Sequence, residues 1–138
     1  MAFECDAKMA TTIKAEAVRW FASKFGMKNP MYASKFYVPE KSWTGQSAWW
    51  FEIPERIIET PKLAEIHLLC QVAPDAKDFH YLKVPVEFLN KEKPNLCVRK
   101  NNKLSLFLSA EQNEMFVEKR GGKQVGFGQL LKTTNLAT

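Results

Sequence analysis

The chain has 138 residues, of which 46% are hydrophobic and 25% are charged. These values are ordinary for a globular protein, and they exclude a fully disordered or fibrous chain. We expect one domain over residues 1–138, with frayed ends at 1–10 and 133–138. No apolar run approaches the roughly 20 residues of a membrane span, so we expect no membrane partner.

The three cysteines, Cys5, Cys70 and Cys97, stand far apart in the sequence. No Cys-x-x-Cys pair is present, which excludes a zinc ribbon or a thioredoxin-like motif. The first residues include acidic side chains and no apolar stretch of signal-peptide length. These features favour a cytoplasmic protein with reduced cysteines.

The net charge of +5 is unevenly distributed along the chain. Residues 1–90 hold 11 basic and 11 acidic side chains, whereas residues 91–138 hold 9 basic and 4 acidic ones. A one-sided basic segment attracts polyanions, although it also serves simply as a solvated surface.

The first predicted element is a helix from Thr12 to Phe25. Gly26 suits the left-handed residue that ends many helices, and Pro30 prevents the helix from continuing. Apolar residues recur at helical spacing and form one stripe. This stripe consists of Ile13, Ala17, Trp20, Phe21 and Phe25.

Beyond Pro30 the apolar period changes to two, which is typical of strands. In the segment Ala48–Ile53, Trp49, Phe51 and Ile53 point to one side, whereas Trp50 and Glu52 point to the other. A helical turn is predicted at 55–59, between Pro54 and Pro61. The other strands predicted in this half are Tyr32–Val38, Glu65–Val72 and Phe79–Val84.

The C-terminal part contains turn signals between short elements. Pro85 is suited to the start of a short helix over 85–90. Asn101-Asn102 favours a tight two-residue hairpin between strands 96–99 and 103–108. Gly121-Gly122 predicts a turn between 115–119 and 123–127, and the segment 127–132 is predicted to form a short helix.

Short loops join most of these strands, so the sheet should be largely antiparallel. We therefore predict an α+β fold in which an N-terminal helix packs on a sheet of about five to seven strands. One or two further short helices complete the fold.

The two histidines, His67 and His80, are the natural candidates for acid–base or metal chemistry. A hairpin about residues 74–78 would place His80 opposite Gln71, which is four residues, or roughly 13 Å, from His67. That separation is too long for a shared ion, and no phosphate loop or nucleophile elbow is present. We expect neither a metal nor a cofactor.

Glu52 is the one acidic residue set within an aromatic strand. Burial there would raise its pKa and suit it to acid–base chemistry. The alternative is that Glu52 pairs with a basic neighbour such as Lys83. The order of a helix followed by strands is similar to the core of restriction-endonuclease-like nucleases. Those enzymes carry a Glu-x-Lys motif, and no glutamate here has a lysine two positions later. Because the resemblance covers only the order of elements, it assigns no family. An unrecognised enzyme with Glu52, His67 or His80 in a pocket, such as one with a divergent nuclease-like fold, is the second alternative.

Basic hairpins together with aromatic strands are typical of proteins that bind single-stranded nucleic acids. Trp43, Trp49 and Trp50 cluster in the sequence, and Trp50 faces away from the predicted core. Our leading hypothesis is a non-catalytic DNA- or RNA-binding module. The first alternative is a protein–protein interaction or regulatory domain. The sequence does not set the oligomeric state. The predicted contact residues are Trp50, Arg99, Lys100, Lys103, Arg120 and Lys123.

Overall fold

The computed structural model describes residues 2–26, 30–42, 45–60 and 63–133, with side chains described from residue 13 to residue 132. Helix α1 (Ala2–Phe25) begins ten residues before the predicted start at Thr12, so the backbone of 2–10 is helical. It ends as predicted, because Gly26 adopts a φ of +76° and its N–H donates to the Ala22 carbonyl at 3.1 Å. Of the ends predicted to fray, residues 1 and 134–138 lie outside the described residues.

Seven strands in the described part of the chain form two sheets rather than the one sheet that we predicted. A four-stranded sheet has the order β1-β3-β4-β7, and a three-stranded sheet has the order β2-β6-β5. The strands are β1 (Met31–Ser34), β2 (Ala48–Pro54), β3 (Glu65–Gln71), β4 (Phe79–Pro85), β5 (Cys97–Val98), β6 (Lys103–Ser109) and β7 (Leu131–Thr133).

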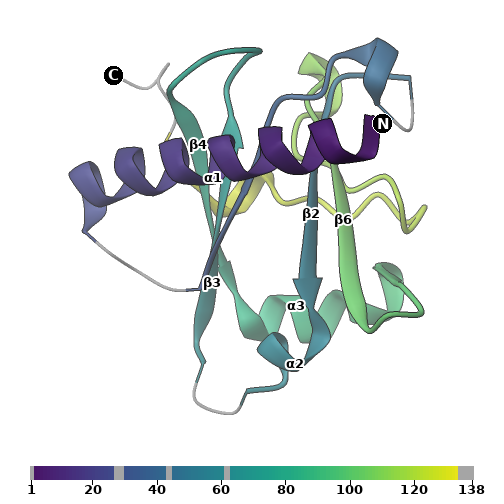
Figure 1. The fold of residues 1–138 in the computed structure, drawn as a ribbon. Helices are drawn as coiled ribbons and strands as arrows, with labels where there is room; N and C mark the ends of the chain where they lie inside the picture. Colours follow the sequence, from purple (N-terminus) through teal and green to yellow (C-terminus); the bar gives the residue numbers. More distant parts are fainter. Residues whose placement is uncertain (1, 27–29, 43–44, 61–62, 134–138) are drawn as a thin grey trace.

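Two short helices, α2 (Glu55–Ile58) and α3 (Val86–Glu92), confirm the predicted helical segments after Pro54 and Pro85. Both lie at the lower end of the sheets in Figure 1. Single 3-10 turns occur at 39–41, 93–95, 112–114 and 128–130. The α+β class and the mostly antiparallel pairing are therefore confirmed.

One strand pair is parallel. β1 is shorter than the predicted strand Tyr32–Val38, and it pairs in parallel with β3, with Met31 opposite His67 and Ser34 opposite Cys70. This pairing is possible because β2, which follows β1 in the chain, leaves for the other sheet.

Two further predictions need correction. The segment predicted as a helix at 127–132 is a 3-10 turn (Gly128–Leu130) followed by β7, whose pairing satisfies backbone groups at the edge of β4. The β5–β6 hairpin exists, but its loop has three residues: Arg99 N–H donates to the Lys103 carbonyl at 2.8 Å, and Asn102 adopts a φ of +61°. The segments flanking Gly121-Gly122 pair as predicted, through an isolated bridge from Val117 to Gly126.

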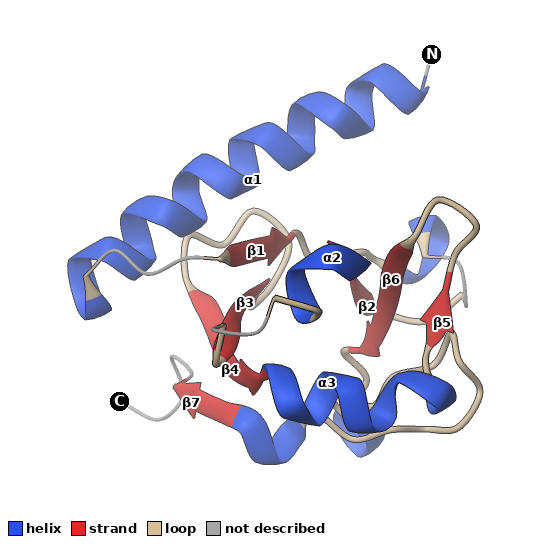
Figure 2. Ribbon diagram, turned by 90° about the horizontal axis from the view of Figure 1, so that it is seen from below, coloured by secondary structure: helices blue, strands red, loops and turns tan. Residues whose placement is uncertain are grey.

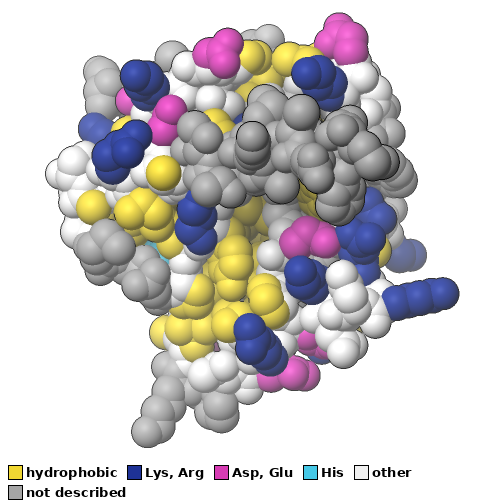
Figure 3. All heavy atoms as spheres, in the orientation of Figure 1, with side chains coloured by type: hydrophobic (Ala, Val, Ile, Leu, Met, Phe, Trp, Pro, Cys, Tyr) yellow, Lys and Arg dark blue, Asp and Glu magenta, His cyan; other side chains and the backbone are white. Residues whose placement is uncertain are grey.

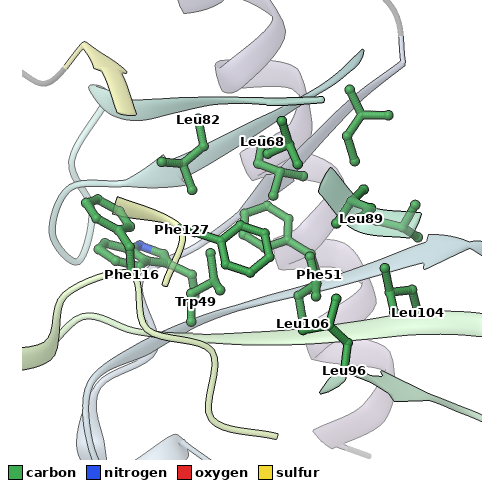
Figure 4. Packing of buried hydrophobic residues seen from close by; sticks show 14 of the residues in the cluster. Trp49, Phe51, Leu68, Leu82, Leu89, Leu96, Leu104, Leu106, Phe116 and Phe127 are labelled. Atoms are coloured by element: carbon green, nitrogen blue, oxygen red, sulfur yellow. The ribbon is translucent and has the colours of Figure 1, made fainter. Parts of the chain in front are cut away.

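The main core fills the space between the two sheets (Figure 4). Trp49, Phe51 and Ile53 point into it from β2, as the alternation predicted. Trp49 stacks on Phe116, with ring centroids 5.1 Å apart and an interplanar angle of 13°. The inward residues of the other strands are Ile66, Leu68, Cys70, Leu82, Val84, Leu104, Leu106 and Leu108.

A second core lies on the opposite face of the four-stranded sheet, under α1. Ala17, Trp20 and Phe21 of the predicted stripe pack there against Leu69 and Tyr81. Figure 2 shows that the C-terminal half of α1 runs near β1 and β3, whereas its N-terminal half diverges from β2 and β6. The four-stranded sheet is thus covered on both faces.

None of the helices in the described ranges is both long enough and apolar enough to cross a membrane.

Candidate nucleic-acid interface

The outer face of the three-stranded sheet carries the aromatic residue that we predicted to be exposed. Trp50 is 37% exposed, whereas its neighbour Trp49 is fully buried. Its indole Nε1 donates to Ser105 Oγ at 3.1 Å, and its backbone N–H donates to Ser34 Oγ at 2.9 Å. The first bond anchors the indole ring, and the second anchors the backbone of β2 beside β1. Trp43 lies outside the described residues.

Glu52 and Arg99 form an ion pair beside this tryptophan. Arg99 Nη1 lies 2.8 Å from Glu52 Oε1, and Glu52 pairs across the sheet with Ser105. The predicted pairing of Glu52 with Lys83 is wrong, because Lys83 lies 3.6 Å from Glu65 in the other sheet. Glu52 partly neutralises Arg99, so a phosphate would have to compete for this guanidinium.

The tip of the β5–β6 hairpin presents two of the predicted basic residues to solvent. Lys100 and Lys103 are exposed, and among the described residues neither has an acidic partner. The three-residue loop projects them from the end of the sheet that carries Arg99. Arg99, Lys100 and Lys103 therefore come together on the β5–β6 hairpin, and Lys103 pairs with Pro54, four residues along β2 from Trp50. Trp50 and Lys103 lie on the same face of the sheet, because paired residues and alternate residues of a strand share a side.

The second basic turn, residues 119–123, is held by a buried carboxylate that sequence reasoning missed. Glu118 is fully buried, and its Oε2 accepts from the N–H groups of Phe107 and Arg120 at 2.8 and 2.9 Å. Its Oε1 accepts from the N–H of Gly121 at 2.8 Å. A glutamate three residues before Gly121-Gly122 was the available signal, since turn amides often bind a nearby acidic side chain.

This turn lies at the other end of β5 from the hairpin tip. A Cβ on Gly121 would come within 2.4 Å of the Asn95 carbonyl oxygen, so the turn packs closely on the residues that precede β5. Lys119 is paired with Glu114 at 2.8 Å, while Lys123 is exposed. Arg120 nevertheless reaches the level of Trp50, because Glu118 Oε2 accepts from the N–H groups of both Arg120 and Phe107, and Phe107 is the cross-strand partner of Trp50.

Figure 3 shows how charge is distributed over one face of the molecule. Lys and Arg side chains lie on both sides of this face, including the side where β6 runs in Figure 1, and hydrophobic side chains are visible between the positions of β3 and β2.

The two histidines lie on opposite faces of the four-stranded sheet. The register differs by one residue from our prediction, since His80 pairs with Cys70 and His67 pairs with Lys83. His67 Nδ1 lies 2.6 Å from the Tyr81 hydroxyl oxygen under α1. They cannot share an ion, and no metal-binding group of three or more ligands occurs in the described part of the chain.

Burial explains the titration of the groups beside the histidines. It lowers the pKa of His80, which contacts Trp49 edge-on, and it raises the pKa of the Cys70 thiol well above the ordinary value. Burial, and secondarily the Glu65 carboxylate, raises the pKa of Tyr81 to about 12. A thiol with a raised pKa is a poor nucleophile, so Cys70 and His80 do not form an activated pair.

No family model, curated protein or solved structure matches this chain.

Proposed function

We propose that the protein is a non-catalytic nucleic-acid-binding module that contacts a strand through the outer face of the β2-β6-β5 sheet. The observation that carries the proposal is the 37% exposed Trp50, whose indole is anchored to Ser105 by one hydrogen bond, on the same face of the sheet as Arg99 and Lys103. A fixed aromatic ring offers a stacking platform for a base, and the cations track the phosphates.

The arrangement favours a single strand over a duplex. Stacking on Trp50 requires an unpaired base, and the sheet offers no helix to enter a major groove. Free thiols at Cys70 and Cys97 support a cytoplasmic location as part of this proposal.

The test is a fluorescence-anisotropy titration with single- and double-stranded DNA and RNA at several salt concentrations. We expect single strands to bind more tightly. With about four phosphate contacts, the logarithm of the binding constant should fall with the logarithm of salt concentration with a slope of about −3.

Two variants and one control sharpen the test. The double substitution Lys100→Gln and Lys103→Gln should make the salt slope shallower by about 1.4, because each contact contributes about 0.7. Lys132→Gln in β7, an exposed position at the edge of the other sheet, makes the same change in net charge as either of these substitutions and should leave the slope unchanged. Absence of binding at low salt, or an equal loss in the control, would overturn the proposal in favour of a protein partner.

A further inference from the structure

A cleft of about 450 Å³ opens beside α1, where the chain crosses from one sheet to the other. Ile13 and Glu16 of α1 form one wall, and Pro74 and Asp75 of the β3–β4 turn form another. The crossover segment 35–41 forms the third. The volume lies within the range of small-molecule sites, which is about 300–1,000 Å³.

Hydrogen bonds from a buried amide fix the floor of this cleft. Gln71 is 3% exposed; its Oε1 accepts from the Phe36 N–H at 2.9 Å, and its Nε2 donates to the Ala76 carbonyl at 2.8 Å. Trp49 Nε1 donates to the Gln71 carbonyl at 2.7 Å. The crossover segment and the β3–β4 turn are therefore tied together, so the cleft is preformed rather than assembled by a ligand.

A buried cation and an aromatic ring lie together in the crossover wall. Lys35 is only 9% exposed, and its ammonium nitrogen lies 4.8 Å from the centroid of the Tyr37 ring. Lys41 adds a second, exposed cation to the lining. Charges in a partly buried site act in a lower effective dielectric than in water, so this end of the cleft attracts an anion.

The acidic side chains come from the other two walls. Glu16 lies on α1, and Asp75 is held at a φ of +63° in the β3–β4 turn. Carboxylates accept hydrogen bonds from hydroxyl and amino groups. The lining thus combines partners for an anionic group, a flat ring and hydroxyl groups.

This cleft continues the outer face of the three-stranded sheet. Tyr37 forms a two-bond antiparallel bridge with Ala48, and paired residues point to the same side. Ala48 and Trp50 are alternate residues of β2, so they share that side too. Tyr37 therefore borders the surface that carries Trp50.

We propose that the Lys35–Tyr37 cleft binds one nucleotide, with its phosphate at Lys35 and Lys41 and its sugar hydroxyls at Glu16 or Asp75. The inference deepens the proposed function and rests on it for the choice of ligand class. It implies that a bound strand extends from Trp50 to the cleft and that the cleft takes its terminal nucleotide.

The experiment is an NMR titration of the full chain with AMP, GMP, CMP and UMP, each added separately. We expect saturable shifts of the Phe36, Tyr37 and Ala76 amides, with an apparent Kd of about 1 mM or lower for at least one nucleotide. The hairpin amides 100–103 should not shift.

Charge-removing variants keep the aliphatic stem of each lysine. Lys35→Met should weaken nucleotide binding about tenfold or more, since charge-assisted bonds are strong in such a site. Because a substitution at the buried Lys35 also affects folding, Lys41→Met at an exposed position is a second test. It should weaken nucleotide binding about threefold. Lys77→Met, on the same turn as Asp75 but outside the cleft lining, is the matched control and should bind normally.

The outcomes separate this inference from the proposed function. If oligonucleotides bind but no mononucleotide does, the inference fails and the proposed function stands. If mononucleotides bind at the cleft but oligonucleotides do not bind at all, the proposed strand-binding function is overturned and the cleft is kept as a site for single nucleotides. The free amino acid tryptophan is titrated in the same way. If it binds more tightly than any nucleotide, the two lysines and two carboxylates of the lining form a site for a zwitterion, and the inference is overturned.

Discussion

The outer faces of the two sheets differ in how far the rest of the chain covers them. In the four-stranded sheet the outer face is apolar and lies under α1, with Leu69, Phe79 and Tyr81 buried. In the three-stranded sheet Ala48, Ser105, Phe107 and Ser109 of the outer face are buried as well, but Trp50, the Glu52–Arg99 pair and Lys103 reach solvent. Both sheets bury their inner faces in the same core.

Tyr81 and Trp50 show what this difference teaches. Both are aromatic residues at outward positions of strands, Tyr81 on the inner strand β4 and Trp50 on the edge strand β2. Tyr81 is 4% exposed, whereas Trp50 is 37% exposed. The residue type does not explain the contrast, because aromatic rings serve equally in cores and in binding surfaces. The C-terminal half of α1 covers the first position, and its N-terminal half diverges from the second sheet (Figure 2).

The largest expected effect comes from breaking the helix–sheet contact. Phe21 is fully buried, and its ring lies edge-on to Tyr81 with centroids 4.8 Å apart. Phe21→Ala should lower the free energy of unfolding by about 3–5 kcal/mol, because it leaves a cavity under α1. Urea denaturation measures this, and Phe25→Ala, one turn further at a 36% exposed position, should cost less than half as much. Equal losses at the two positions would show that α1 does not seal this face as described.

The edge of the three-stranded sheet depends on a side chain. Glu118→Ala should cost about 3 kcal/mol, because three backbone N–H groups lose their carboxylate acceptor. Glu114→Ala removes only the ion pair with Lys119 and should cost about 1 kcal/mol or less. Chemical denaturation of both variants provides the comparison, and an E118A protein as stable as E114A would contradict it.

The inner core should show a smaller, pH-dependent effect. Burial lowers the pKa of His80 in the folded state, so the unfolded chain binds more protons below its ordinary value of 6.5. The contribution of neutral His80 to the free energy of unfolding is fully present above pH 6.5. It is lost as the pH drops toward the folded pKa, by at most about 1.4 kcal/mol per pH unit. The difference between the urea midpoints at pH 7.5 and pH 5.5 should be smaller in His80→Phe than in the native chain. An unchanged pH dependence in this variant would assign the effect to other groups.

The smallest stability effect is expected on the open face. Trp50→Ala should cost about 1 kcal/mol, since Trp50 is already 37% exposed and one bond to Ser105 is lost. The same substitution should weaken single-strand binding by about 1–3 kcal/mol. Denaturation and anisotropy on one preparation separate the two effects. If stability falls as much as in Phe21→Ala, Trp50 belongs to a core and the contrast between the sheets is lost.

Much of the secondary structure could be predicted from local signals. The alternation in Ala48–Ile53 gave the correct inward and outward residues, because side chains alternate across any strand. Gly26 and Pro85 marked element boundaries through their backbone preferences. Asn102 marked the hairpin, although the loop length differed by one residue.

The site was only partly predictable. Trp50, Arg99, Lys100 and Lys103 were found and lie together, because they belong to neighbouring strands and a local hairpin. The cleft at Lys35 and the carboxylate of Glu118 were missed. Both depend on segments distant in sequence, such as residues 36 and 71 or residues 107 and 118, that meet only in the folded chain.

The sequence by itself determined most of the strands and helices and which side of β2 is apolar, since these follow from local geometry and side-chain period. The tertiary structure decided the division into two sheets, the parallel β1–β3 pair and the side on which α1 lies. Those choices depend on burying apolar faces from distant segments together, and no local signal specifies which faces meet. The exposure of Trp50, and with it the proposed function, follows from that last choice.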